Sequence, residues 1–155
     1  MRRVDLERGL FGLLLALWVL SFYLPPARVQ SFFNHPNPSP DQTLPGLRLA
    51  IYSFAALEYC PRNLVNCYYG LLWLANIPML LAPLSFRRVQ EGRGWVFAGF
   101  LTLAAILPLS SLFTLDEIAS ELGGALRIGY AIWVIAIVGT ASLFLWIASS
   151  RKRGM

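Results

Sequence analysis

Residues 68–86 read Tyr-Tyr-Gly-Leu-Leu-Trp-Leu-Ala-Asn-Ile-Pro-Met-Leu-Leu-Ala-Pro-Leu-Ser-Phe, and they decide the fold class of the chain. The stretch carries no charged side chain, and its length approaches the roughly 20 residues that a helix needs to cross a bilayer. Asn76, Pro78 and Pro83 interrupt the apolar run. The stretch therefore predicts a membrane-spanning helix with a break or kink in it.

The composition of the whole chain agrees with a membrane protein. Of its 155 residues, 57% are hydrophobic and only 14% are charged, whereas soluble domains have about 25% charged residues. The net charge is +5, but the basic residues flank apolar segments, so they act as topology signals. We expect one membrane domain over residues 1–155 whose surroundings are the lipid bilayer, with no nucleic-acid partner.

Three further apolar stretches complete the predicted set of spans. They cover residues 9–24, 94–113 and 126–149. A cleaved signal peptide is the alternative for the first, because a basic segment precedes a short apolar core. Asp5 and Glu7 dilute that basic segment, and bulky residues replace a clean cleavage site, so we favour a retained helix. The sequence predicts an all-α integral membrane protein built as a four-helix transmembrane bundle.

Two polar loops, residues 25–67 and 114–125, are expected to form an outer cap on this bundle. Within the first, Leu47–Tyr59 has apolar residues on one helical face but is too short to span, which indicates an interfacial helix. In the second, Thr114 and Glu117 match a capping box, which predicts another short helix. The cap would therefore contain short interfacial helices.

The basic residues also predict the orientation. Nine of the 13 Lys and Arg residues lie in the N-terminal segment, the loop after residue 86 and the C-terminal segment, and the other four lie on the opposite side of the predicted spans. Positive residues remain on the cytoplasmic side of a membrane. We therefore expect a multi-pass protein of a bacterial inner membrane with both termini in the cytoplasm.

Cys60 and Cys67 lie on the predicted outer side, which is an oxidising compartment in bacteria. A structural disulfide between them would close a small ring and stabilise the fold. The alternative is a redox pair, as in membrane thiol oxidases. The close Cys-x-x-Cys spacing of redox motifs is absent, so a structural bond is the favoured interpretation.

Asn76, Pro78 and Pro83 in the second span, with Pro108 in the third, are the candidate packing or pathway residues. Each proline removes a backbone donor, and the carbonyl left behind needs a partner inside a bilayer. In one interpretation the helix is kinked and the Asn76 amide bonds a neighbouring helix. In the other, a broken helix lines a substrate path. Apart from Arg127 at the start of the fourth, no Asp, Glu, His, Lys or Arg lies within a predicted span, which favours the kink.

Sequence motifs for catalysis or cofactor binding are missing. The chain has no nucleophile elbow, P-loop, dinucleotide fingerprint or HExxH pair. Asp116, Glu117 and Glu121 could form an outward cation site, but a capped surface helix explains them with fewer assumptions. We therefore predict no catalytic residue, no cofactor and no metal site.

Two short motifs carry a resemblance. Residues 73–78, Trp-Leu-Ala-Asn-Ile-Pro, and residues 129–133, Gly-Tyr-Ala-Ile-Trp, resemble a group of small four-span bacterial inner-membrane proteins. That group has a W-L-A-N-P-like second helix and a G-Y-x-x-W start to the fourth helix. This chain departs from the pattern by inserting Ile77. The group has no assigned activity, so the resemblance implies a fold and no chemistry.

Three classes of function fit these features. We expect first a non-enzymatic accessory or interaction protein of the inner membrane, with a membrane-protein partner or a second copy of the chain; an immunity-type protein that blocks a membrane-active toxin belongs to this class. The alternatives are an oligomeric transporter or channel subunit, and a membrane thiol or quinone redox protein.

Overall fold

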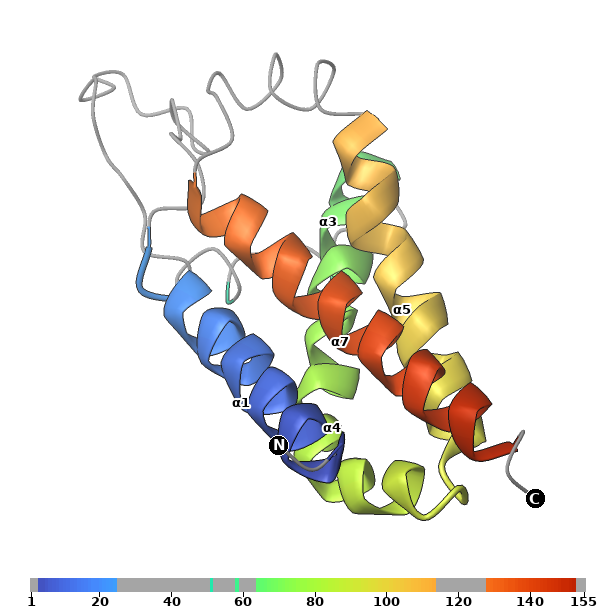
Figure 1. The fold of residues 1–155 in the computed structure, drawn as a ribbon. Helices are drawn as coiled ribbons and strands as arrows, with labels where there is room; N and C mark the ends of the chain where they lie inside the picture. Colours follow the sequence, from blue (N-terminus) through green and yellow to red (C-terminus); the bar gives the residue numbers. More distant parts are fainter. Residues whose placement is uncertain (1–2, 25–50, 52–57, 59–63, 114–127, 153–155) are drawn as a thin grey trace, which may run out of the picture.

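The computed structural model describes residues 3–24, 64–113 and 128–152, together with positions 51 and 58. Its described helices are α1 (Arg3–Ser21), α3 (Leu64–Leu74), α4 (Asn76–Gln90), α5 (Trp95–Phe113) and α7 (Ile128–Lys152). No strand occurs in the described ranges, so the predicted all-α class is confirmed. The long α7 is central to the packing and contacts α1, α4 and α5 (Figure 1).

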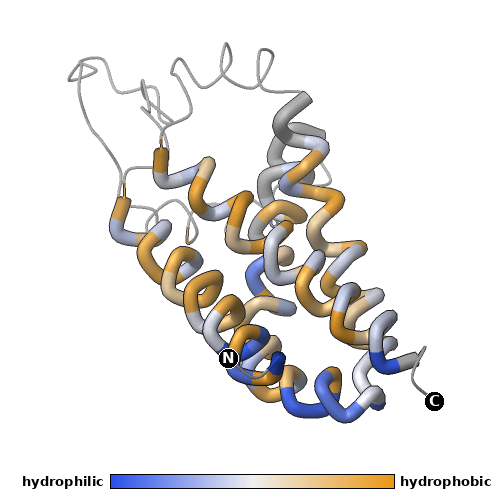
Figure 2. Tube along the Cα trace, viewed as in Figure 1, coloured by the Kyte–Doolittle hydropathy of each residue, from blue (hydrophilic) through white to orange (hydrophobic). Residues whose placement is uncertain are grey.

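Two helical stretches in the described ranges are long and apolar enough to cross a membrane. They are Gly70–Gln90 and Ile128–Arg151, and a shorter apolar helix covers Trp95–Ser110. Large apolar side chains point outward from these helices, with Leu84 of α4 76% exposed. Hydrophilic residues gather at the end of the bundle where both chain termini lie (Figure 2). This distribution is the one that a lipid environment favours.

The helix bounds differ from the predicted spans by a few residues at several ends, and two of the differences are informative. The first helix begins at Arg3 rather than at residue 9, because Arg3 pairs with Glu7 one helical turn later. The predicted second span, residues 68–86, is divided at Ala75 into α3 and α4. By contrast, α5 begins within one residue of the predicted third span and ends with it.

The proline at position 78 explains why the helix is divided at Ala75. Proline cannot donate to the carbonyl four residues earlier, so the regular helical ladder fails beside Leu74. The Ala75 N–H instead bonds to the Leu72 oxygen at 3.2 Å, three residues back, which tightens the turn. Farther along α4, Pro83 interrupts the ladder again, and the later turns of α4 run across the end of the bundle (Figure 1).

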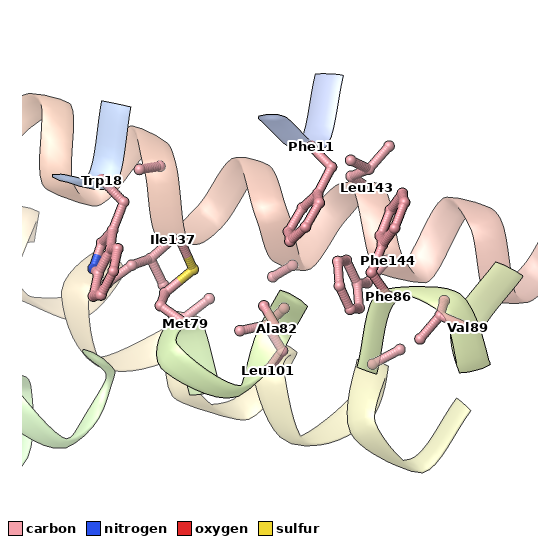
Figure 3. Close-up of a cluster of buried hydrophobic side chains, with 14 of the residues drawn as sticks. Phe11, Trp18, Met79, Ala82, Phe86, Val89, Leu101, Ile137, Leu143 and Phe144 are labelled. Carbon is pink, nitrogen blue, oxygen red and sulfur yellow. The ribbon is translucent and has the colours of Figure 1, made fainter. Parts of the chain in front are cut away.

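An aromatic cluster fills the core where four helices meet. Phe144 of α7 is fully buried, and its ring centroid lies 5.6 Å from Phe11 of α1 and 5.8 Å from Phe86 of α4. Phe97 of α5 lies 5.8 Å from the same ring, and Phe11 stacks on Phe86 at 4.4 Å. Aromatic pairs at these distances add to the stabilisation from burial, so this cluster holds α1, α4, α5 and α7 together. Figure 3 shows Phe11, Phe86 and Phe144 side by side.

The turn between α4 and α5 requires glycine at two positions. Gly92 has a φ of 79°, in the left-handed region that glycine tolerates best. The Gly92 N–H bonds to the Val89 oxygen and the Arg93 N–H to the Arg88 oxygen, which is the bonding of a Schellman motif. A Cβ atom at Gly94 would lie 2.7 Å from the Val89 backbone nitrogen. The turn therefore packs directly against the end of α4.

We predict that Gly94→Ala destabilises the protein by about 1–3 kcal/mol, the usual cost of overpacking. Backbone atoms at Val89 cannot move aside as a flexible side chain would. Gly99→Ala in α5 is the matched control, because nothing lies within 4 Å of its added Cβ. The control should be neutral or stabilising, since alanine is the better helix former. Unfolding in mixed detergent micelles, followed by circular dichroism, measures both; equal stability of the two variants would contradict this account of the turn.

Candidate functional site

A polar cluster of three residues joins three helices inside the otherwise apolar core. The Asn76 side-chain oxygen accepts a hydrogen bond of 3.0 Å from the Trp18 indole N–H and one of 2.7 Å from the Trp133 indole N–H. Asn76 is the first residue of α4, whereas Trp18 belongs to α1 and Trp133 to α7. We call this the Asn76 cluster.

The local structure fixes each member of the Asn76 cluster. The break at Ala75 places Asn76 at the start of α4, where it is only 6% exposed. Trp18 is also buried, with the ring of Phe22 edge-on to it at 5.1 Å. The Trp133 ring lies 5.5 Å from the Tyr130 ring. Both indoles are thus held in place by packing as well as by their hydrogen bonds.

The chemistry of the Asn76 cluster is that of a helix contact. An indole nitrogen is only a donor, so the atom that receives both bonds is the amide oxygen, which has two lone pairs. The three side chains are neither acids nor bases at neutral pH, and they cannot pass a proton between them. The cluster satisfies buried polar groups across α1, α4 and α7, which is the packing role in the kinked-helix interpretation.

The three candidate prolines lie in different surroundings. Pro78 is fully buried two residues after Asn76, whereas Pro83 is exposed on α4. Pro108 is fully buried in α5. Near it, the Tyr68 hydroxyl of α3 lies 3.4 Å from the Leu107 oxygen, to which it donates. The structure therefore brings Pro78 close to the Asn76 cluster and places Pro108 at a separate contact between α3 and α5.

Sequence reasoning missed a second polar cluster at the end of the bundle where the termini lie. Glu7 of α1 is fully buried. Its carboxylate pairs with Arg3 at 3.1 Å, accepts a hydrogen bond from the Gln90 side chain at 3.1 Å and lies 3.8 Å from Arg151. We call these four residues the Glu7 cluster. The spacing of Arg3 and Glu7 was a helical signal, but only the fold brings Gln90 and Arg151 to them.

Several predicted site residues lie outside the described residues. Cys60 is one of them, so the Cys60–Cys67 disulfide stays a prediction, although Cys67 lies in α3. The capping box of Thr114 and Glu117 is outside as well. Within the described ranges, no group of three or more His, Cys, Asp or Glu residues is placed to hold a metal ion.

Compared with protein-family models, curated proteins and solved structures, the chain matches none of them.

We predict that Asn76→Leu lowers the free energy of unfolding by about 1–3 kcal/mol, because it removes two interhelical hydrogen bonds, and such bonds between apolar helices contribute roughly 0.6–1.7 kcal/mol each. Thr140→Val is the matched control: Thr140 is equally buried, but its hydroxyl donates to the Ala136 oxygen within α7. Such a local bond contributes little to helix stability, so this variant should stay close to wild type. Detergent-micelle unfolding measures both.

A double-mutant cycle isolates the bond itself. Trp133→Phe should be costly in the wild-type protein and clearly less costly once Asn76 is leucine, because the indole then has no acceptor to lose. Equal costs in the two backgrounds would show that Trp133 contributes only packing.

Proposed function

We propose that this chain is a non-enzymatic accessory protein of a bacterial inner membrane, working through lateral contact with another membrane protein or a second copy of itself. α1, the α3–α4 pair, α5 and α7 are the four spans, and both termini face the cytoplasm. The resemblance to small four-span inner-membrane proteins at residues 73–78 and 129–133 agrees with this proposal.

The Asn76 cluster carries the proposal. In a carrier, a broken helix usually directs polar groups at a substrate or ion near the middle of the membrane. Here the oxygen at the helix break is occupied by the Trp18 and Trp133 indoles. Directly beyond it, fully buried apolar side chains fill the space between helices, among them Met79, Leu101 and Ile137. A filled interior favours a protein that acts through its outer surface.

The four-span arrangement is supported by helix length and by the position of the charges. α5 has 19 residues, which at about 1.5 Å per residue extend over nearly the hydrocarbon thickness of a bilayer. The apolar part of α1 begins at Gly9, after its charged first turns. Glu7 contacts Gln90 and Arg151, so the N-terminal helix, the end of α4 and the C-terminal helix meet at one end. Arg3 and Arg151, which belong to two of the three basic segments, contact Glu7. Gln90 lies in the third segment, which ends at Arg93. One basic membrane face is what the positive-inside rule expects.

The cysteines belong to the same proposal as structural residues. A Cys60–Cys67 bond would hold the outer loop to α3, with no electron transfer to a thiol or quinone partner. Membrane thiol oxidases normally use a second cysteine pair to relay electrons, and the sequence contains only these two cysteines.

Reporter fusions test the topology. A fusion after Met155 should be active as a cytoplasmic reporter, and one after Pro40 as an exported reporter, because the basic segments stay in the cytoplasm. A C-terminal fusion that is active only outside the inner membrane would refute the four-span proposal.

Photo-crosslinking in living cells tests the accessory role. A photoreactive residue at Leu84 or Leu103, both strongly exposed on the apolar surface, should give an adduct of one defined mass with a membrane protein or a second copy. The same residue at Met79, which is fully buried, is the matched control and should give none. The adduct should persist in Cys60→Ser/Cys67→Ser, since the cysteines are not the active groups.

Two outcomes would oppose this proposal. Only lipid adducts at every exposed position, together with solute flux in reconstituted vesicles, would support a transporter or channel. A mixed disulfide trapped by a single Cys60→Ser or Cys67→Ser substitution would support a redox protein.

A further inference from the structure

The Glu7 cluster has more positive charge than its buried carboxylate can neutralise. Arg3 contacts the Oε1 atom of Glu7, and Arg151 contacts its Oε2 atom. The Gln90 side chain donates a hydrogen bond to that Oε2 atom as well. The Arg151 contact is long, at 3.8 Å, beyond the range of a good hydrogen bond. Two guanidinium groups thus share one carboxylate, and one positive charge remains.

A buried donor of Arg151 also lacks an acceptor. Its Nε is buried and has no hydrogen-bond partner among the residues that the structure describes. An arginine carries five N–H donors and no acceptor, and leaving a buried donor unpaired is costly. The Arg151 side chain is nevertheless 37% exposed, so the charge of its guanidinium is open to an anionic oxygen ligand. A turn of the side chain would bring the unpaired Nε donor to the same ligand.

The surface beside the Glu7 cluster is apolar. The Arg3 guanidinium lies 5.0 Å from the centre of the Trp146 ring, which is 43% exposed. Leu6 and Leu10 follow Arg3 on nearly the same side of α1, and both are exposed. The hydropathy pattern shows this change from hydrophilic to hydrophobic at the start of α1 (Figure 2). Indole rings favour the level of the lipid headgroups, so the charged cluster lies where a headgroup meets its acyl chains.

We propose that the Glu7 cluster binds the phosphate of an anionic phospholipid in the cytoplasmic leaflet, between Arg3 and Arg151, with the acyl chains along Trp146, Leu6 and Leu10. This inference rests on the membrane placement proposed above. Arginine suits phosphate because its planar donors can engage two oxygens at once. The apolar surface selects a lipid over free phosphate, since inorganic phosphate has no group to place on it.

Native mass spectrometry of the detergent-purified chain tests the proposal. With equal amounts of phosphatidylglycerol and phosphatidylcholine, wild type should retain the anionic lipid about tenfold better, since each nearby cation strengthens binding of anionic lipid several-fold. The double variant Arg3→Gln/Arg151→Gln should lose this preference. Arg93→Gln is the matched control, because Arg93 is exposed on the α4–α5 turn and outside the cluster, and it should retain the preference.

The outcomes separate the hypotheses. The lipid site would be refuted if wild type showed no preference for phosphatidylglycerol, or if Arg93→Gln lost the preference as fully as the double variant. Neither result depends on whether the double variant folds. Displacement of the lipid by excess inorganic phosphate would overturn the lipid assignment in favour of a free-anion site. Membrane placement is measured separately by carbonate extraction from cells: an extracted protein refutes the proposed function, whereas a membrane-retained protein with no lipid preference refutes this inference alone.

Discussion

The packing of the described helices depends on satisfying one amide oxygen in an environment that has no water to offer. Asn76 begins α4 just before Pro78, whose missing backbone donor leaves the Leu74 carbonyl without its regular helical bond. The Asn76 side chain is itself buried among apolar residues. Two indole N–H groups, from α1 and α7, converge on that oxygen. Because a buried polar group without a partner is costly, the three helices are held in one relative position.

α1 shows how the rest of the structure follows from this constraint. Glu7, Phe11 and Trp18 lie on one buried face of the helix, and each makes a different kind of contact. At one end Glu7 pairs with two arginine side chains and the amide of Gln90. Phe11 stacks in the aromatic cluster, and Trp18 donates to the Asn76 oxygen. Three contacts, spread over about 16 Å of helix, therefore fix the position and rotation of α1 relative to its neighbours. A rotation that preserves one contact breaks the other two.

The sequence predicted some of this structure and not the rest, for identifiable reasons. A long apolar run predicts a helix wherever it ends in charged residues, which is why α5 matches its predicted span within one residue. Asn76 stood out because it is polar among apolar neighbours. Its partners Trp18 and Trp133 could not be recognised in the same way, because tryptophan is common in apolar helices, both in the core and at the interface. The burial of Glu7 could not be seen, because its contact with Gln90 joins residues 83 positions apart. Packing against distant segments decides such cases.

The spacing of the Asn76 cluster along the chain has a consequence for how the protein is made. Trp18 precedes Asn76 by 58 residues, and Trp133 follows it by 57. During synthesis the first indole is available when Asn76 leaves the ribosome, whereas the second arrives only with the last helix. A chain that ends before α7 therefore has only one of the two indole donors of the Asn76 oxygen, and the second bond forms only when the last helix joins the others.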